Sequence, residues 1–517
     1  MAIEEIGVAM SRTRTALLMP LLSFFLLGLI ACNDSPVSSA ASAAEVPNFL
    51  LMIGDDMAVE TLAAYGVGKD TAYTPNLDRL SAQGLRFDNF WSQPVCSPTR
   101  ATLLTGQYGF RTGVGVPVNG ITGLDWPRPP KPAGAPFEPA GMGPGMGGAN
   151  TDAEATPDGG SEPLINLDRQ SLAADAFTFP QALKLEGGPA YASAAIGKWH
   201  LANDANGGLQ HPLRVGFDHY SGSIRTGGLY SYFAWSKAVD GVLTDGKTGY
   251  GTTDIVDDAI AWLARRDEAT PWFLWVAFNA PHTPIHLPPT ELLHTDLAQL
   301  DPAVDTGTNP HAYYKAMIEA LDTEIGRLLD TLNPEQRENT YVIFMGDNGT
   351  PRQGVTAPFE AGRAKGTLYQ GGINVPFIVA GPGIEAGRET SALANSVDVF
   401  ATVLELAGID IESAVPADTT LDSVSLAPIF YGDDATTVRD IAYADAFGAE
   451  RGGYRNHRTI RNERYKLIIK IESRTEELYD LESDPYEHDD LLLADLSDES
   501  KLNYEQLRSR ITELRMR

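Results

Sequence analysis

Cysteine is almost absent from this chain, since only Cys32 and Cys96 occur among its 517 residues. An exported chain normally uses cysteines in pairs, and a cysteine without a partner is a candidate for chemistry. Cys32 closes an N-terminal apolar segment in the string L-I-A-C, which gives it a role of its own. Cys96 is then left alone, and it becomes the first candidate functional residue.

Positive charge is also scarce, because 39 Lys and Arg residues are set against 68 Asp and Glu residues, a formal net charge of −29. This balance argues against binding of nucleic acid by bulk electrostatics. It does not exclude a small anionic substrate, because a local cationic pocket outweighs a diffuse acidic surface at short range. We therefore expect no nucleic-acid partner.

The N-terminus offers little that could span a membrane. Its apolar segment, Ala16 to Ile30, follows Arg12 and Arg14 and is too short for a confident transmembrane helix. It is typical of a secretory signal, and L-I-A-C resembles the bacterial lipobox, in which the chain is cut before an acylated cysteine. An ordinary signal peptide cut near Ala41 or Ala44 is the alternative.

We therefore expect a lipoprotein signal peptide over residues 1–31 and a flexible Ser- and Ala-rich tether over residues 32–46. The mature protein would be exported to the periplasm or the cell surface. Its one membrane contact would be the lipid on Cys32.

Short apolar runs alternate with helical patterns along the body of the chain. Runs without polar alternation are typical of buried parallel strands, and strands that alternate with helices indicate an α/β fold. We expect a mainly parallel central sheet flanked by helices. The predicted strands are Asn48–Ile53, Tyr191–Ile196, Trp272–Phe278 and Thr340–Met345, and the predicted helices are Asp78–Gln83, Thr253–Arg265 and Tyr313–Leu332.

The pattern changes after about residue 430, where short alternating strands such as Tyr465–Ile471 precede a helical stretch over Glu499–Arg515. We predict a catalytic domain over residues 47–430 and a smaller C-terminal subdomain over residues 431–517, an antiparallel sheet with one helix. The stretch 127–160, rich in Pro, Gly and Ala, is expected to be an insertion, either a substrate-selecting lid or a disordered loop.

Acidic and amide side chains follow two of the predicted strands. Asp55 and Asp56 come after the first strand, and Asp347 and Asn348 follow the last. The carboxyl ends of parallel strands meet at one edge of a sheet, which is where α/β folds bind ligands. Three carboxylates close together would repel one another unless a cation lay among them, and oxygen ligands favour Ca²⁺, with Mg²⁺ as the alternative.

Cys96 stands at the predicted start of a helix, because Pro98 and the apolar residues after it favour helix initiation. Backbone N–H groups and the positive end of the helix dipole make such a position suitable for an anion. Arg100 adds a planar cation. From these residues alone, the thiol could be a nucleophile, a redox sensor or a small buried apolar group.

The string C-S-P-T-R-A-T-L-L-T-G, from Cys96 to Gly106, resembles the signature of the type I sulfatases, which are arylsulfatase-like members of the alkaline phosphatase superfamily. Other blocks resemble the same family in the same order along most of the chain, and the ordered set is highly specific. They are Thr74-Pro75-Asn76-Leu77-Asp78, Gly197-Lys198-Trp199-His200-Leu201, Pro281-His282-Thr283-Pro284, Lys365-Gly366-Thr367 and Glu477-Leu478-Tyr479-Asp480-Leu481.

The resemblance implies that a maturation enzyme converts Cys96 to Cα-formylglycine (3-oxoalanine). The aldehyde hydrates to a geminal diol, and one hydroxyl attacks the sulfur of the substrate. The resemblance also implies a metal site formed by Asp55, Asp56, Asp347, Asn348 and the modified Cys96.

The resemblance further implies catalytic roles for cationic and histidine side chains. Arg100 and Lys198 would offset the sulfate charge, and Lys365 and His282 would do so while helping the leaving oxygen. His200 would take the proton of the second diol hydroxyl, which expels sulfate and regenerates the aldehyde.

Some neighbouring positions depart from the family pattern. Thr99 stands where the family often has Ser, and Gln370 and Asn374 stand where it often has Glu and Arg. None of these changes removes a group with an implied catalytic role, but they leave the substrate open. We expect a hydrolase of organic sulfate monoesters, acting on a sulfated glycan or an aryl sulfate. A formylglycine-dependent phosphonate monoester or phosphodiester hydrolase and a non-catalytic surface binding protein are the alternatives.

Overall fold

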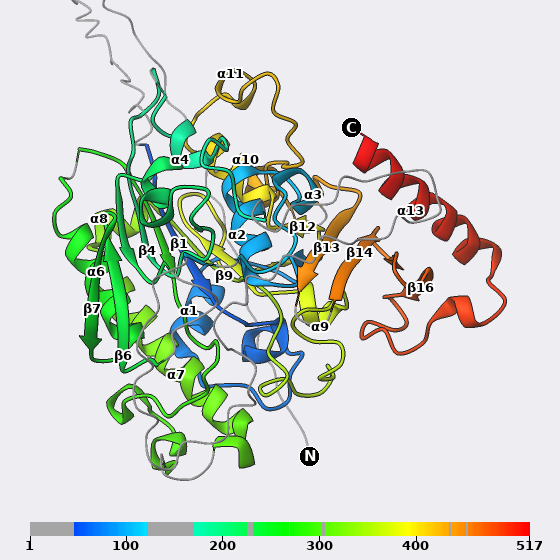
Figure 1. The fold of residues 1–517 in the computed structure, drawn as a ribbon, viewed down its shortest axis with the longest axis horizontal. Coiled ribbons are helices and arrows are strands. Elements are labelled where there is room, and N and C mark those ends of the chain that lie inside the picture. Colours follow the sequence, from blue (N-terminus) through cyan, green and yellow to red (C-terminus); the bar gives the residue numbers. More distant parts are fainter. Residues whose placement is uncertain are drawn as a thin grey trace, which may run out of the picture. The chain divides into compact units, whose positions relative to one another are not determined.

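A ten-stranded sheet forms the centre of the larger part of the molecule (Figure 1). Its spatial order is β11-β2-β10-β9-β1-β8-β4-β5-β6-β7, and the five strands from β9 to β5 are parallel to one another. The computed structural model describes residues 46–118, 120–121, 170–185, 187–224, 231–267, 269–301, 306–433, 436–450 and 453–516.

The central strands are the apolar runs of the sequence, and the outer strands are shorter or more polar. In chain order, the strands of this sheet are β1 (Asn48–Gly54), β2 (Leu85–Phe87), β4 (Ala192–Gly197), β5 (His219–Gly222), β6 (Ala234–Val239), β7 (Val242–Thr248), β8 (Trp272–Ala277), β9 (Thr340–Gly346), β10 (Phe377–Ala380) and β11 (Arg388–Thr390).

Both faces of the sheet are covered by helices. In β1, Phe49 and Leu51 belong to the core on one face, whereas Leu50 and Met52 belong to the core on the other. Buried residues of α2, α4, α10 and α12 complete the first core, and buried residues of α1, α6 and α7 complete the second. Every residue of β1 is therefore buried, which explains why the strand shows no polar alternation.

The helices vary from single turns to five turns. They are α1 (Pro75–Gln83), α2 (Cys96–Thr105), α3 (Gly109–Thr112), α4 (Phe179–Ala182), α5 (His211–Arg214), α6 (Gly251–Leu263), α7 (Pro310–Leu329), α8 (Pro334–Glu338), α9 (Gln370–Ile373), α10 (Asp398–Leu406), α11 (Ile411–Ala414), α12 (Ala427–Tyr431) and α13 (Asp498–Met516). None of the helices in the described part of the chain combines the length and the apolar character that a membrane span requires.

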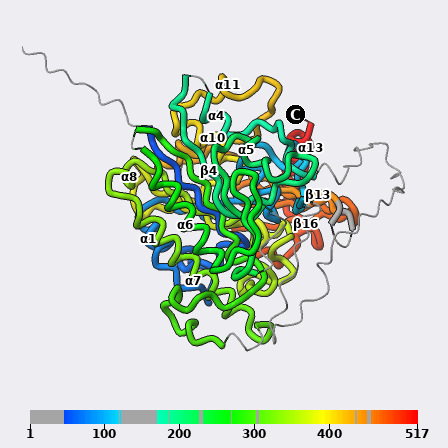
Figure 2. The backbone as a smooth tube through the Cα atoms, turned by 60° about the vertical axis from the view of Figure 1, so that its left-hand side comes forward, coloured from blue at the N-terminus to red at the C-terminus, as the bar shows by residue number. Residues whose placement is uncertain are grey.

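The C-terminal part contains a separate four-stranded antiparallel sheet with one long helix. The strands β13 (Ala442–Glu450), β14 (Gly453–Arg461), β15 (Tyr465–Lys470) and β16 (Thr475–Asp480) pair in sequence order. Leu507 and Ile511 of α13 pack against the apolar side chains of this sheet. Figures 1 and 2 both show this part on the opposite side of the molecule from α6. The strands β3 (Phe90–Trp91) and β12 (Ala394–Asn395) form a further short parallel pair.

The predicted fold class is confirmed: a large, mostly parallel sheet with flanking helices is joined to a small antiparallel sheet with a helix. The antiparallel strands at both edges of the large sheet were not predicted. The signal peptide, most of the tether and the insertion at 127–160 lie outside the described residues. The domain boundary at residue 430 stays a prediction.

Candidate active site

The carboxyl ends of four neighbouring parallel strands meet at one edge of the large sheet, as the sequence predicts. Strands β9, β1, β8 and β4 are adjacent in this order, so the loops that follow them lie side by side. These loops carry the predicted acids, histidines and lysines, and the loop between β9 and α9 includes Lys365. The helix α2 adds Cys96 and Arg100. The residues gathered here are Asp55, Asp56, Cys96, Arg100, Lys198, His200, His282, Asp347, Asn348 and Lys365.

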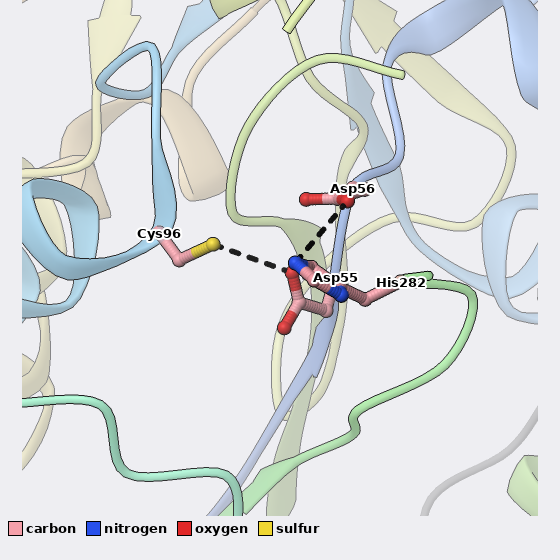
Figure 3. Close-up of side chains that lie close together, drawn as sticks. All are labelled: Asp55, Asp56, Cys96 and His282. Carbon is pink, nitrogen blue, oxygen red and sulfur yellow. Dashed lines mark hydrogen bonds and ion pairs between the residues drawn. The ribbon is translucent and has the colours of Figure 1, made fainter. Parts of the chain in front are cut away.

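Cys96 is the first residue of α2, and its side chain reaches the end of β1 (Figure 3). Its Sγ lies 3.5 Å from Oδ1 of Asp55 and 3.4 Å from Nζ of Lys198. Burial, together with the negative charge of Asp55, raises the pKa of the thiol. The unmodified cysteine is therefore a neutral thiol, and thiolate chemistry is disfavoured.

Three of the five predicted metal ligands, Asp56, Asp347 and Asn348, are joined directly by hydrogen bonds. Asp347 Oδ1 accepts a hydrogen bond from the backbone N–H of Asp56 at 3.1 Å, and Asn348 Nδ2 donates to Asp56 Oδ1 at 2.8 Å. Asp56 Oδ2 and Asn348 Oδ1 are buried and accept no hydrogen bond from the described residues. Two oxygens of this kind, beside further carboxylates, fit a hard divalent cation.

His282 also approaches this group, which the sequence did not predict. One ligand atom from each of Asp55, Asp56, Cys96 and His282 lies within 4.8 Å of the other three (Figure 3). His282 Nε2 is 3.8 Å from Asp56 Oδ2. The loop after β8 therefore places the Nε2 atom of His282 next to the oxygen ligands.

The two adjacent aspartates have opposite electrostatic environments. Burial, followed by repulsion from Asp347, raises the pKa of Asp55 to about 8. Burial would also raise the pKa of Asp56, but the positive charge of Lys365 and the nearby His282 outweigh it and lower that pKa. At neutral pH Asp56 is an anion, whereas Asp55 holds a proton that a bound cation would displace.

Three cationic side chains surround these carboxylates. Arg100 Nη2 lies 2.7 Å from Asp347 Oδ2 and 3.6 Å from Asp55 Oδ2. Lys198 Nζ donates a hydrogen bond to Asp55, and Lys365 Nζ forms an ion pair with Asp56. Arg100 and Lys198 are buried, whereas the side chain of Lys365 is 21 % exposed. A site with this much fixed positive charge suits an anionic substrate.

The two histidines are both neutral at neutral pH. Burial and the charge of Lys198 lower the pKa of His200 well below its usual value. Burial and the charge of Lys365 lower the pKa of His282 to about 3. His282 Nδ1 lies 2.7 Å from the carbonyl oxygen of Thr283, so the ring proton is on Nδ1 and Nε2 is an acceptor.

Backbone strain is concentrated at the same place. Asp56 and His200 have φ angles of 72° and 59°, in the left-handed region that residues other than glycine rarely adopt. Such conformations persist only where the surrounding structure holds them, and they cluster at functional sites. Here, Asn348 holds the Asp56 carboxylate, and the hydroxyl of Ser97 donates to the carbonyl oxygen of His200 at 2.7 Å.

Some residues that hold the backbone of the site in place were not predicted from the sequence. The hydroxyl of Thr99 donates to the backbone oxygen of Asp347 at 2.6 Å, and the hydroxyl of Tyr314 donates to the backbone oxygen of Asp56. Thr99 and Ser97 stand at the variable positions of C-x-P-x-R, so the motif itself offered a signal for them. Tyr314, within α7, carries no sequence signal of this role.

Comparison with known proteins gives two matching family models. The model described as sulfatase matches residues 47–136 and 144–409, which is more than half of the chain. The model described as N-sulphoglucosamine sulphohydrolase, C-terminal, matches residues 363–517. The second match begins before α9 and extends over the small antiparallel sheet.

Curated relatives and solved structures agree with these matches. The chain is 31 % identical to N-acetylgalactosamine-6-sulfatase of Canis lupus familiaris over 77 % of this chain and 68 % of the relative. It is 31 % identical to the protein of that name from Homo sapiens over 75 % of this chain and 66 % of the relative.

Two solved structures share the fold. One, described as Ps i-CgsB in complex with k-i-k-neocarrahexaose, has a TM-score of 0.66 and 24 % identity and covers 91 % of this chain and 92 % of its own. The other, described as being in complex with its substrate D-glucosamine-2-N,6-O-disulfate, has a TM-score of 0.65 and 22 % identity and covers 91 % of this chain and 98 % of its own. The chain belongs to the sulfatase family, whose enzymes hydrolyse sulfate esters.

Proposed function

We propose that this protein hydrolyses organic sulfate monoesters through a formylglycine derived from Cys96 and a divalent cation, Ca²⁺ or Mg²⁺, bound beside it. The observation that carries the proposal is the placement of Cys96. Its side chain lies at the start of α2, 3.5 Å from a buried carboxylate oxygen of Asp55 and 3.4 Å from the ammonium nitrogen of Lys198. A group at this point faces the cation ligands and the cationic side chains together.

The proposed cation ligands are Asp55, Asp56, Asp347 and Asn348, with His282 close to them. When bound, the cation would draw charge from the sulfate, and the hydrated aldehyde would supply the hydroxyl that attacks sulfur. Arg100 and Lys198 are buried beside Cys96 and would offset charge on the sulfate oxygens without reorganisation.

Proton transfers are assigned to His200 and Lys365. His200 is neutral, so it can accept the proton whose loss expels sulfate from the enzyme. Neutral His282 has its proton on Nδ1, directed to Thr283, and presents an acceptor to the site. The ammonium of Lys365, on the more exposed side, is the proton source for the leaving oxygen.

The proposed substrate is a sulfated glycan, with an aryl sulfate as the simpler possibility. Support comes from the relatives with 31 % identity, which are named for desulfation of an amino sugar.

The exported, lipid-anchored location and the maturation enzyme that oxidises Cys96 belong to the same proposal. They rest on the L-I-A-C string and on the C-S-P-T-R string respectively.

The test compares hydrolysis of sulfated oligosaccharides and nitrophenyl sulfate with hydrolysis of matched phosphate diesters and phosphonate monoesters. The protein should be made with a maturation enzyme. We expect the sulfate esters to react faster, and the Cys96→Ala variant to lose all measurable activity. A matched Thr99→Ser variant, which keeps the hydroxyl that contacts Asp347, should retain most activity. Faster reaction of the phosphorus esters, or activity that survives Cys96→Ala, would contradict the proposal.

A further inference from the structure

Trp199 separates two residues of the site and points away from it. The indole is 1 % exposed and packs in the core beneath the sheet edge, whereas Lys198 and His200 on either side lie in the active site. Several hydrogen bonds hold the backbone around it, among them one from the N–H of Lys198 to the carbonyl oxygen of Ala277 at 2.7 Å. Arg100 Nη1 donates to the carbonyl oxygen of Lys198 at 2.7 Å, Ser97 Oγ donates to that of His200, and Trp199 N–H donates to that of Ser223 at 3.0 Å.

Among the residues that the structure describes, the indole ring has one polar contact, which is with His211. Trp199 Nε1 lies 2.9 Å from His211 Nδ1, and the aromatic rings of Phe217 and Tyr220 also pack near the indole. Aromatic packing restrains the ring to a plane, but a hydrogen bond also fixes its direction. A buried indole N–H without an acceptor would be costly, so this contact selects one ring orientation.

The hydrogen bond defines the tautomer of His211. An indole N–H can only donate, so Nδ1 of His211 must be the acceptor and the ring proton must be on Nε2. Nε2 lies 3.1 Å from the carbonyl oxygen of Leu172, to which it donates. Burial lowers the pKa of His211 to about 4, in keeping with a neutral ring. His211 thus connects the segment at Leu172 to Trp199.

We propose that His211, in its Nε2-protonated tautomer, is a positioning residue: by accepting the indole N–H of Trp199 it fixes the segment that presents Lys198 and His200. This inference rests on the proposed function of that site. The segment needs such a restraint, because Gly197 and His200 both have positive φ angles, 98° and 59°. A shift of the order of 1 Å in catalytic groups can reduce a rate about a hundredfold.

Two amide variants separate the two hydrogen bonds of His211. In His211→Asn, the amide oxygen takes the place of Nδ1 and still accepts from Trp199. In His211→Gln, the longer side chain places an N–H near the position of Nε2, which preserves the bond to Leu172 but leaves the indole without an acceptor. Trp199→Phe removes the donor and keeps an aromatic ring.

The kinetic test measures kcat and KM on a sulfate ester, with melting temperatures as the control for folding. We expect Trp199→Phe and His211→Gln each to lower kcat about tenfold or more, with KM within about twofold. The double variant should be no slower than the slower single variant, because both changes remove one interaction. His211→Asn should recover most of kcat. Additive losses, or equal losses in both amide variants, would overturn the proposal.

A second measurement does not depend on activity. In protein with ¹⁵N-labelled histidine, the ring signals of His211 should show the Nε2-protonated tautomer at neutral pH. The His200 signals should move in His211→Gln and Trp199→Phe but stay in place in His211→Asn. A charged or Nδ1-protonated His211, or His200 signals unmoved in all variants, would overturn the proposal. Absence of sulfatase activity in the wild-type protein would instead defeat the proposed function, and these spectra would still decide the role of His211.

Discussion

At the scale of single residues, the site shows that neighbours along the chain can have opposite properties. Asp55 and Asp56 are both buried, yet the pKa of Asp55 is raised to about 8 while that of Asp56 is lowered. The difference comes from their partners, because Asp347 repels the charge of Asp55 whereas Lys365 favours that of Asp56. The sequence predicts both residues as cation ligands, but it could not predict that their pKa values shift in opposite directions.

The first prediction concerns pH and the cation. The pKa of Asp55 rises from 3.8 to about 8 on folding, so the folded chain binds the additional proton between these values. Asp55 therefore makes the cation-free protein less stable as pH rises through this window. A cation displaces the proton, so its affinity should rise with pH up to about 8.

The measurement is the increase in melting temperature on adding Ca²⁺ to chelator-treated protein at pH 6 and at pH 8. We expect a clearly larger increase at pH 8, since the stabilisation grows with the ratio of free ligand to its dissociation constant. The Asp78→Asn variant, changed at a carboxyl group outside the site, is the control and should behave like the wild type. Equal increases at the two pH values would contradict the assignment.

The second prediction concerns the proton for the leaving oxygen. Lys365→Ala should slow hydrolysis of an alkyl or sugar sulfate about 10²- to 10⁴-fold, the usual range for a general acid. It should slow nitrophenyl sulfate much less, because that leaving group needs little protonation. Lys198→Ala, which removes charge near Cys96 instead, should slow both substrates to a similar extent. A loss in Lys365→Ala that does not depend on the leaving group would argue for a purely electrostatic role.

At the scale of elements, the apolar runs that become β1, β4, β8 and β9 could be predicted because both their faces are buried. The strand β7 could not, because its sequence V-L-T-D-G-K-T is polar and its side chains are largely exposed. The strand β7 joins the sheet through antiparallel pairing with β6. Edge strands of this kind are set by tertiary contacts and carry a weak local pattern.

A contact between α7 and α1 gives a structural role to Asn76 in the T-P-N-L-D block of the sequence. Asp322 of α7 accepts hydrogen bonds from the backbone N–H groups of Asn76 and Leu77, at 3.0 and 2.8 Å, in the first turn of α1. The side-chain amide of Asn76 also donates to it, at 2.9 Å. A carboxylate from one helix thus caps the N-terminus of another.

The third prediction is that Asp322→Ala lowers the free energy of unfolding by about 3 kcal/mol, because buried donors lose a charged acceptor. Thermal and urea unfolding at pH 7.5 would measure the change. Asp330→Ala is the control at the C-terminal end of α7, where the carboxylate is 69 % exposed, and it should change stability by about 0.5 kcal/mol or less. Similar effects of the two variants would show that the cap contributes little.

At the scale of the whole molecule, the small antiparallel sheet supports the loop that carries Lys365. Glu487 accepts a hydrogen bond from the backbone N–H of Gln370, and Arg455 donates to the carbonyl oxygen of Gly366 at 3.0 Å. Glu487 also forms an ion pair with Lys466 at 2.6 Å, and both side chains are fully buried. The C-terminal part thereby contributes to the active site, although no residue predicted from the sequence to act in catalysis lies in it.

The fourth prediction follows from burial of this ion pair. Lys466→Met should destabilise the protein by about 3 to 5 kcal/mol, because it leaves the Glu487 carboxylate buried without its partner. The double variant Lys466→Met with Glu487→Gln should be more stable than Lys466→Met alone. The glutamine is uncharged and its carbonyl can still accept from Gln370. A double variant less stable than Lys466→Met would contradict the account.

Most of the site could be predicted from strand ends and family resemblance, because its residues lie in short motifs of the chain. The rest depends on distant contacts. The approach of His282 to Asp56 spans 226 positions of sequence, and the bond from the Tyr314 hydroxyl to Asp56 has no local pattern. Such contacts are fixed by the order of strands in the sheet and become visible only in the folded chain.

The central claim is that Cys96 becomes an aldehyde next to the cation ligands, and peptide mass spectrometry tests it most directly. Protein isolated from its native host is cleaved with trypsin, which releases Phe87–Arg100 with Cys96 inside it. The account predicts the mass of the aldehyde form at this residue and its reaction with a hydrazine. A peptide that carries only an intact, alkylatable thiol would contradict it.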